Sequence, residues 1–283
     1  MKVVRDAAAM RALSEERRLR GDRIGFVPTM GALHEGHLSL VRLARSGATC
    51  VVVSIFVNPT QFGPGEDFEL YPRDVERDCD LLDEVGCDLV FAPTVEGMYP
   101  EGHRTEVSVT GLSDRLCGRF RPGHFNGVAT VVLKLFNVVR PDFAVFGQKD
   151  VQQLIVIRRM VEDLDLGVEI VAGPTIRETD GLAASSRNLY LSGTERRQAT
   201  CLHRALRQAE TLFRSGERRA GVLVDEMRRI IEAEPSAKPE YVSIVDPSSL
   251  EDLDMISRDA LAVLAVRVGR TRLIDNVRLM VEG

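Results

Sequence analysis

The chain has 283 residues, which is enough for one large domain or two modest ones with a sizeable buried core. Hydrophobic residues make up 44% and charged residues 28%, with 23 glycines and 12 prolines, and this composition excludes the disordered and collagen-like classes. The net charge of -5 argues against a protein that holds nucleic acid mainly by neutralising backbone phosphates.

The first part of the chain alternates strand-like with helix-like segments. Residues 49–57 are nearly continuously hydrophobic, as expected for a strand covered on both faces, whereas residues 36–45 repeat their hydrophobic positions at helical spacing. In chain order the segments are strand 24–28, helix 36–45, strand 49–57, helix 72–85, strand 88–91, helix 124–139, strand 143–146, helix 151–164 and strand 168–171. This alternation predicts an α/β fold with a Rossmann-like, doubly wound parallel sheet, which binds ligands beyond the carboxyl ends of its strands.

The pattern changes after about residue 175. Two segments dense in Arg and Glu have helical periodicity, and three later segments alternate like strands of a small antiparallel sheet. The helical segments are 194–215 and 222–233, the strands are 241–245, 261–268 and 271–275, and residues 236–239 are expected to form a loop. We therefore expect two domains, residues 1–173 and a smaller α+β domain of residues 174–283.

The sequence also indicates a cellular setting. No apolar run approaches the roughly 18 residues of a membrane-spanning helix, and the N-terminus lacks the pattern of a secretory signal, so we expect a cytoplasmic protein without a membrane partner. The five cysteines are odd in number, widely spaced and without a Cys-x-x-Cys pair, which predicts reduced, mostly buried thiols.

Charge is unevenly distributed along the chain. Residues 115–160 contain eight Lys or Arg against two acids, while residues 60–106 contain thirteen acids against three bases. A solvated helix face would explain the basic stretch as well as an anion site would. Lys149 is of interest because it is one of only four lysines in the chain.

The densest polar cluster is Pro-Thr-Met-Gly-Ala-Leu-His-Glu-Gly-His at residues 28–37, between the first strand and the first helix. A glycine-containing turn before a helix directs backbone N–H groups to where a phosphate could bind, and His34 and His37 add donors. The same histidines could be metal ligands, but a convincing third ligand and the His-Glu-x-x-His spacing are missing, so no protein metal site is expected. The remaining alternative is a helix cap with two incidental histidines.

A second cluster, Asn-Pro-Thr-Gln-Phe at residues 58–62, follows the second strand on the same edge of the sheet. Asn58 and Gln61 are neutral donors and acceptors suited to hydroxyls and carboxylates, although turn chemistry alone could explain Asn-Pro.

Two further clusters could bind a nucleotide. Gly147 permits close approach, Lys149 offers a mobile cation, and Asp150 could cap the next helix or hold a ribose. Ala-Ser-Ser-Arg-Asn at residues 184–188 offers hydroxyls and a guanidinium to phosphate oxygens, as any polar surface loop could. The phosphate-loop and Gly-x-Gly-x-x-Gly motifs are missing, so a nucleotide would need another kind of phosphate site.

Five separated segments resemble those of the pantoate–β-alanine ligase (pantothenate synthetase) family, in the same order and from near the start of the chain to its end. They are residues 28–37, 54–62, 124–128, 146–153 and 180–188. The His-Glu-Gly-His segment is similar to the His-x-x-His signature of the HIGH-motif nucleotidyltransferase superfamily, and residues 184–188 resemble its mobile Ser-rich phosphate loop.

The resemblance implies an ATP-dependent ligase of pantothenate and coenzyme A biosynthesis. Pantoate is activated by ATP as pantoyl adenylate with release of pyrophosphate, and β-alanine then attacks to give pantothenate and AMP. ATP is a co-substrate with Mg²⁺ on its phosphates, nucleic acid is not a partner, and a homodimer is expected. Residues 1–173 would bind ATP and pantoate, and residues 174–283 would close over them. Two rival readings are another nucleotidyltransferase of the superfamily and a non-catalytic nucleotide-binding protein.

The resemblance also implies roles for individual residues. His34, His37 and Lys149 are the expected catalytic residues, with His37 a candidate acid–base group, while Gln61 and Gln153 hold pantoate and Gln61 also approaches β-alanine. The expected ATP-binding residues are Met30, Gly31, His34, His37, Gly147, Lys149, Asp150, Ile176, Ala184, Ser185, Ser186 and Arg187. Among these, Lys149 binds the phosphates, Asp150 the ribose and the Ile176 backbone the adenine, while residues 185–187 close over the triphosphate.

Three positions depart from the family's usual pattern. Gln148 stands where Glu is expected, Val151 where an aromatic residue is common, and Ala184 where Met is common. None of these changes removes a charged phosphate contact, so they concern local packing and affinity rather than the reaction.

Overall fold

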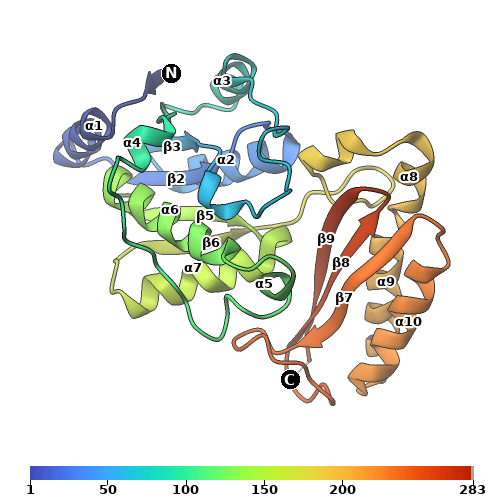
Figure 1. The fold of residues 1–283 in the computed structure, drawn as a ribbon. Coiled ribbons are helices and arrows are strands. Elements are labelled where there is room, and N and C mark those ends of the chain that lie inside the picture. Colours follow the sequence, from blue (N-terminus) through green and yellow to red (C-terminus); the bar gives the residue numbers. More distant parts are fainter. Residues whose placement is uncertain (282–283) are drawn as a thin grey trace. The chain divides into compact units, whose positions relative to one another are not determined.

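A computed structural model describes residues 1–281, and its first sheet has six strands, all parallel, in the order β1-β4-β3-β2-β5-β6 (Figure 1). The strands are β1 (Lys2–Val4), β2 (Ile24–Thr29), β3 (Cys50–Ile55), β4 (Leu89–Phe91), β5 (Phe143–Gly147) and β6 (Glu169–Gly173). The chain moves outward from β2 through β3 to β4, then returns to the other side of β2 with β5. This reversal is the switch point of a doubly wound sheet, so the predicted fold class is confirmed.

Helices cover both faces of this sheet, which explains why its strands are hydrophobic at successive positions. In β2, Phe26 meets Phe136 of α6, while the next residue, Val27, lies in a core with Val41 of α2 and Leu82 of α3. The helices up to residue 163 are α1 (Ala7–Leu19), α2 (Glu35–Gly47), α3 (Val75–Glu84), α4 (Val95–Met98), α5 (Cys117–Phe120), α6 (His124–Val139) and α7 (Val151–Asp163), with 3₁₀ turns η1 (Pro59–Gln61) and η2 (Gln148–Asp150).

The register of the central strands brings the predicted loops to one edge. Strand β2 pairs with β3 from Ile24 opposite Cys50 to Thr29 opposite Ile55, so both strands end together. The N–H of Phe56 still donates to the carbonyl of Thr29 at 3.1 Å. Segment 30–34, which follows β2, and η1, which follows β3, therefore leave the same edge of the sheet.

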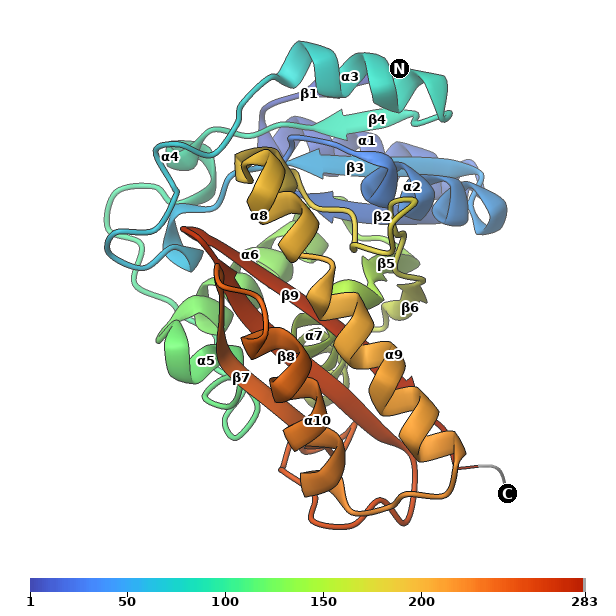
Figure 2. The same ribbon diagram turned by 90° about the vertical axis from the view of Figure 1, so that its right-hand side faces the viewer.

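The C-terminal part forms a second sheet of three antiparallel strands in the order β7-β8-β9. Helices α9 and α10 pack on one of its faces, around buried side chains that include Leu206, Leu223 and Leu264 (Figure 2). The elements are η3 (Ser186–Tyr190), α8 (Gly193–Gln198), α9 (Cys201–Arg214), α10 (Ala220–Glu232), β7 (Ala237–Val245), β8 (Ala260–Val268) and β9 (Thr271–Leu279).

One expectation about this sheet was wrong. Residues 237–239 belong to strand β7 rather than to a loop. Pro239 pairs with Val266 just before a register shift, and β7 is an edge strand. Proline is tolerated at the edges and bulges of sheets, which is why its presence did not end the strand.

The chain divides into two compact units. The first comprises residues 1–113, 121–148 and 153–174, and the second comprises residues 114–120, 149–152 and 175 onward. The short segments 114–120 and 149–152 belong to the same unit as the C-terminal residues. The predicted division at a single point of the sequence, between residues 173 and 174, does not include them in that unit.

The cysteines are unpaired, and four of the five are buried. Burial, reinforced by the charge of Asp88, raises the pKa of Cys50 to about 11 and that of Cys87 to about 12. These two side chains are therefore protonated thiols, and the burial of four cysteines agrees with the prediction of mostly buried thiols. Among the described helices, none combines the length and apolar character that crossing a membrane requires.

Candidate active site

The two predicted histidines lie at the N-terminus of helix α2, and each caps it. His34 is the N-cap residue, and its Nδ1 accepts a hydrogen bond from the N–H of Gly36 at 3.1 Å. The Nδ1 of His37 accepts from the N–H of His34 at 3.4 Å, and the ring centroids are 4.1 Å apart. The helix-cap interpretation is therefore correct for one nitrogen of each ring.

These caps determine where the imidazole protons lie. A neutral imidazole carries one N–H, and because each Nδ1 accepts a hydrogen bond, the proton of each ring is assigned to Nε2. His34 and His37 thus combine two Nε2–H donors with the positive end of helix α2. Capping and anion binding are compatible functions of the same pair.

The loop before the helix is held by Asp78, a residue of α3 that is 1% exposed. Its carboxylate oxygens accept hydrogen bonds from the N–H groups of Ala32 and Leu33, each at 2.8 Å. The backbone has a positive φ at both Gly31 (81°) and Ala32 (50°). Residues other than glycine rarely adopt this left-handed conformation. A Cβ on Gly31 would lie 2.8 Å from an Asp78 oxygen, so the turn requires glycine. Burial raises the pKa of Asp78, and the two backbone hydrogen bonds oppose this shift.

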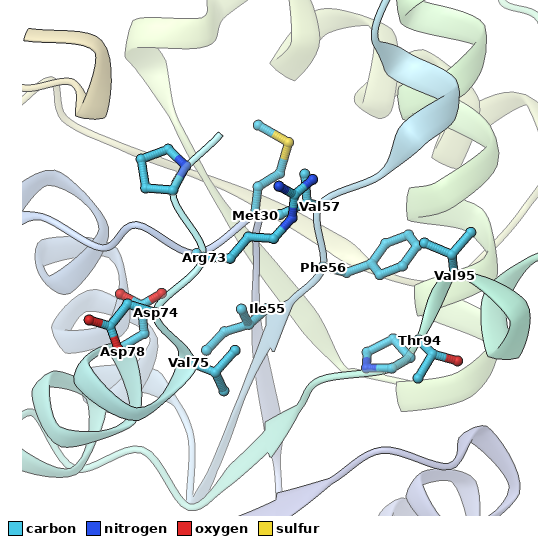
Figure 3. A pocket seen from close by; sticks show the side chains of 13 residues that line it. Met30, Ile55, Phe56, Val57, Arg73, Asp74, Val75, Asp78, Thr94 and Val95 are labelled. Carbon is cyan, nitrogen blue, oxygen red and sulfur yellow. The ribbon is translucent and has the colours of Figure 1, made fainter. Parts of the chain in front are cut away.

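A pocket of about 200 Å³ opens beside this loop at the carboxyl ends of β3 and β4 (Figure 3). Met30, Phe56 and Val57 line it together with Arg73. The guanidinium of Arg73 donates to the carbonyls of Phe68, Glu69 and Tyr71 at 2.8 to 3.4 Å, so this cation organises its own loop. The described wall of the pocket is thus mainly apolar, and the predicted site residues Met30 and Gly31 are both part of it.

Gln61 lies in the buried turn η1 and contacts the first cluster directly. Gln61 is only 9% exposed. Its Nε2 donates to the Sδ of Met30 at 3.0 Å, and its Oε1 accepts from the side chain of Asn58 at 3.1 Å. Asn58 is 1% exposed, and its Oδ1 accepts from Tyr99 and Thr60 at 2.9 and 3.0 Å. The amide of Gln61 is therefore oriented by a chain of buried polar groups.

The backbone of Gln61 is held from the other side by residues far along the chain. Its carbonyl accepts from the guanidinium of Arg121 at 3.2 Å and lies 2.8 Å from Nδ1 of His124. Arg121 also binds both carboxylate oxygens of Glu66, at 2.6 and 2.7 Å. Burial by itself would raise the pKa of Glu66, but the hydrogen bond and charge of Arg121 outweigh it and lower that pKa.

Replacing Glu66 by glutamine is expected to lower the free energy of unfolding by about 1–3 kcal/mol at pH 7, because Arg121 would lose its charged partner. A lowered folded-state pKa stabilises the protein above the ordinary pKa of Glu66, 4.5, and this contribution disappears as the pH falls through the folded value. Urea unfolding at pH 7 and pH 4 should therefore show wild type and variant converging in acid. A difference independent of pH would contradict this, and Glu69→Gln, on the exposed part of the same loop, is the matched control.

Helix α6 touches the η1 turn through a glycine. A Cβ added to Gly127 would lie 2.6 Å from the carbonyl carbon of Thr60 and 2.8 Å from the amide nitrogen of Gln61. The Gly127 carbonyl accepts from the side chain of Asn58 at 3.1 Å. Only glycine permits this backbone contact, which seats Gln61 against the sheet edge.

The second group of predicted residues lies in the second unit, around Lys149. The Lys149 ammonium donates to the carbonyl of Ala184 at 2.9 Å. Burial is the largest influence on the pKa of Lys149 and lowers it, Asp150 and Asp275 oppose this shift, and Arg187 adds to it. Because Ala184 contributes through its backbone, its departure from the usual Met leaves this contact intact.

Residues 176–188 form a tied loop. The N–H of Ala184 donates to the carbonyl of Ile176 at 2.9 Å, and Arg177 and Ala183 form a β-bridge. Ser185 caps the 3₁₀ turn η3 by accepting from the N–H of Arg187 at 3.4 Å, and Ser186 begins that turn. Ile176 and the Ser-rich segment are thus joined, as binding of one ligand by both would require.

The remaining predicted residues lie at the start of α7. Gly147 ends strand β5, Asp150 is exposed at the end of η2, and Gln153 is half-buried in the first turn of α7. The adjacent Gln152 is buried, and its amide accepts from the N–H of Cys117 at 3.1 Å and donates to the carbonyl of Arg115 at 2.8 Å. Gln152 is therefore structural, which leaves Gln153 as the predicted binding residue.

Within the first unit the structure brings Met30, Gly31, His34, His37 and Gln61 to one edge of the sheet. Within the second it brings together Lys149, Ile176 and residues 184–187. Site candidates that the sequence analysis missed are Asp78, Tyr99, Arg121 and Glu66, which lie in charged or irregular segments without a local motif. Asn58 had a signal, the Asn-Pro turn, but a turn alone did not predict its burial.

Three arginines of the basic stretch 115–160 have acidic partners in distant segments. Arg115 pairs with Glu251, Arg121 with Glu66, and Arg140 with Glu15. The solvated-face interpretation is thus only part of the answer, since these side chains tie distant segments together. Across the residues that the structure describes, no three His, Cys, Asp or Glu side chains gather as a metal site would require.

Comparison with known proteins gives one consistent result. The family model described as pantoate-beta-alanine ligase matches residues 2–278. A curated pantothenate synthetase of Thermoanaerobacter sp. strain X514 is 56% identical over 268 residues, 95% of each chain. The crystal structure of pantothenate synthetase from Thermus thermophilus has a TM-score of 0.94 at 48% identity, covering 99% of this chain and 100% of that one. A pantoate-beta-alanine ligase from Francisella tularensis, complexed with "Beta-gamma ATP and Beta-alanine", has a TM-score of 0.81 at 33% identity, covering 98% and 97%.

Proposed function

Because the chain belongs to the pantoate–β-alanine ligase family, we propose that it activates (R)-pantoate with ATP and joins it to β-alanine, releasing AMP and pyrophosphate. The match over residues 2–278 carries this proposal. It is supported by the edge of the first sheet, which carries both the imidazole donors at a helix N-terminus and a buried amide that contacts Met30.

The first half-reaction needs positioning and stabilisation of negative charge. A pantoate carboxylate oxygen attacks the α-phosphorus of ATP, and the bond to the pyrophosphate oxygen breaks. The proposed contribution of His34 and His37 is to donate from Nε2 to the phosphates as charge moves to the leaving group. No protein nucleophile is required.

In the second half-reaction the neutral amine of β-alanine attacks the acyl carbon of pantoyl adenylate. The bond between that carbon and the AMP oxygen breaks, AMP leaves, and the amine gives up its proton. His37 is one candidate acceptor for this proton, and it could take the proton only at Nδ1, in place of the hydrogen bond from the His34 N–H, because its Nε2 is already protonated. Phosphate binding explains His37 equally well, so the acid–base role depends on a measured pH profile.

The proposed pantoate ligands are Gln61 and Gln153. Neutral amides can donate to a carboxylate and also accept from hydroxyl groups, both of which pantoate presents. A superfamily member that transfers a nucleotide to a phosphate would favour cations at these positions. The orientation of the Gln61 amide by Asn58 supports the assignment.

The remaining proposed ATP contacts are Lys149 on the phosphates, Asp150 on the ribose, the Ile176 backbone on the adenine and residues 185–187 over the triphosphate. Gly147 permits close approach of the nucleotide. Mg²⁺ is proposed to be held by the phosphates and water, because imidazole, ammonium and guanidinium groups bind oxyanions rather than hard cations. When bound, it would neutralise charge on the departing pyrophosphate.

Three wider assignments rest on the family resemblance and belong to the same proposal. The protein is proposed to act as a homodimer in the cytoplasm, with residues 174–283 closing over bound substrates. Light scattering at working concentration tests the dimer, and small-angle scattering with and without ATP tests the closure.

Isotope exchange between pyrophosphate and ATP tests the proposed function. The exchange should require pantoate, and AMP release should then require β-alanine. Exchange without pantoate would indicate a different carboxylate or phosphate substrate. Its absence with every combination of substrates would favour a non-catalytic nucleotide-binding protein.

Replacing Gln61 by alanine is expected to weaken pantoate binding about tenfold or more while ATP binding changes less than twofold, since a lost hydrogen bond to a charged group is worth about 1.5–3 kcal/mol. Calorimetric titration of both ligands measures the two affinities. Equal losses would remove Gln61 from the pantoate site. Gln208→Ala, on helix α9 of the second unit, is the matched control and should bind both ligands normally.

A further inference from the structure

Two adjacent polar residues, Asp275 and Asn276, are buried in strand β9, with exposed fractions of 3% and 4%. Buried polar groups are costly unless they are paired, so each needs partners. Successive side chains of a strand point to opposite faces of the sheet. Leu273 and Leu279 share the face of Asp275 and lie in the core with α9 and α10. Asp275 and Asn276 therefore serve different partners.

Asp275 holds the base of the loop that carries residues 184–187. Its two carboxylate oxygens accept from the guanidinium of Arg177 at 2.6 and 3.0 Å, a two-pronged pair that fixes orientation. The same guanidinium donates to the carbonyl of Gly181 at 3.1 Å. Since Arg177 also bridges to Ala183, both sides of the loop base are tied to β9.

Asn276 holds the backbone of Lys149. Its Nδ2 donates to the carbonyl of Lys149 at 2.9 Å, and the Lys149 ammonium donates to the carbonyl of Ala184, also at 2.9 Å. These contacts form a closed ring. Strand β9 binds Arg177, whose loop leads to Ala184; the Ala184 carbonyl binds the Lys149 side chain, and the Lys149 backbone binds β9 again. Every member of this ring lies in the second unit.

We propose that Asp275 and Asn276 are positioning residues that set the place of the phosphate-binding groups of the second unit. Asp275 places the Ser-rich loop through Arg177, and Asn276 places Lys149. This inference rests on the proposed function, in which Lys149 and residues 185–187 bind the ATP phosphates. A strand is a suitable base for them, because its backbone is fixed by the β8 ladder while a loop has no such support.

Asp275 also acts on the charge of Lys149. The charged groups around that ammonium are Asp150 of η2, Asp275 of β9, Arg187 of η3 and Arg177 of the loop. The two acids raise the pKa of Lys149 and the two arginines lower it. Removing the Asp275 charge leaves Arg177 unneutralised, so Lys149 should lose its proton at a lower pH. Burial and the charge of Arg177 also lower the pKa of His203. His203 is therefore neutral in the alkaline range and does not contribute to a titration there.

The test compares Asp275→Asn and Asn276→Ala with the wild-type protein and with Lys149→Ala. Small displacements of binding groups cost up to about a hundredfold in rate, and we expect each variant to slow single-turnover adenylate formation and weaken ATP binding about tenfold. Pantoate affinity should stay within about twofold of wild type, because its proposed ligands Gln61 and Gln153 lie in the other unit. The alkaline limb of the rate against pH should move to lower pH in Asp275→Asn and should not move in Asn276→Ala.

Asp246→Asn is the matched control, since Asp246 is another buried acid of the second unit, paired with Arg258 at 2.8 Å and outside the ring. It should lose stability without a change in ATP affinity or in the alkaline limb. A double-mutant cycle of Asp275→Asn with Arg177→Gln should show non-additive losses, because both changes break the same path. Where Asp275→Asn does not fold, Arg177→Gln tests the placement of the Ser-rich loop and Asn276→Ala tests the placement of Lys149.

Wild-type ATP binding in Asp275→Asn and Asn276→Ala, together with a loss in Lys149→Ala, would overturn the inference while leaving the proposed function intact. Equal weakening of ATP and pantoate would also overturn it, since that pattern indicates general structural damage. Failure of the proposed function has a different signature, the absence of pantoate-dependent exchange in the wild-type protein.

Discussion

Replacing His37 by alanine is expected to slow the formation of pantoyl adenylate by about a hundredfold, the cost of removing one preorganised donor from a transition state that gains negative charge. The structure gives this expectation its geometry. Because Nδ1 of His37 accepts from the backbone of His34, the ring cannot rotate freely and its proton is assigned to Nε2. A rapid-quench single-turnover measurement with saturating ATP and pantoate isolates this step.

The same change removes part of the cap of helix α2, which costs about 0.5–2 kcal/mol of stability, so a folding control is needed. Ser39→Ala serves this purpose, because Ser39 lies in the same helix and its hydroxyl donates to the carbonyl of Gly36. It should affect stability without affecting the chemical step. A folded His37→Ala protein with a rate within a few-fold of wild type would exclude His37 from the adenylation mechanism.

Replacing Gly127 by alanine is expected to lower the free energy of unfolding by about 1–3 kcal/mol and to weaken pantoate binding. Alanine is a better helix former than glycine by about 1 kcal/mol, so helix propensity alone predicts the opposite sign. The contact decides, because the new methyl group would meet the carbonyl of Thr60 and the amide nitrogen of Gln61, and backbone atoms cannot rotate away. Helix α6 and turn η1 must separate, which moves the Gln61 amide.

Gly221 provides the control, since it lies in helix α10 and nothing is within 4 Å of a Cβ built there. Gly221→Ala should leave stability unchanged or raise it. Thermal unfolding of both variants and calorimetric titration with pantoate give the comparison. If Gly127→Ala were as stable as Gly221→Ala and bound pantoate normally, the contact between α6 and η1 would not position Gln61.

The sequence predicted five of the six strands of the parallel sheet because each of these five carried its own signal. Residues 49–57 are nearly continuously hydrophobic because β3 is covered on both faces, and the helices between strands show the spacing of one buried stripe. The short strand β1 and helix α1 had no such signal. Helix α1 buries only Met10 and Ser14, so its sequence lacks the broad hydrophobic stripe that marks the other helices.

Residues 28–37 could be predicted as an anion site from local chemistry alone, since a turn, a helix start and two histidines are adjacent in the chain. Asp78 could not be identified in this way. It lies in an acidic helix among several similar carboxylates, and only the packing of α3 against the sheet brings it to the N–H groups of Ala32 and Leu33. The same is true of Arg121, which reaches the carbonyl of Gln61 from 60 positions away.

The sequence by itself therefore determined the fold class, the family resemblance and the proposed substrate-binding residues, because these depend on periodicity and on short contiguous motifs. The tertiary structure decided which buried groups hold those residues in place: Asp78 for the histidine loop, Asn58 and Arg121 for Gln61, and the Asp275-Asn276 pair for Lys149 and its loop. The physical reason is that hydrogen bonds and ion pairs act over about 3 Å in space, whatever the separation along the chain. Only folding brings these partners within that distance.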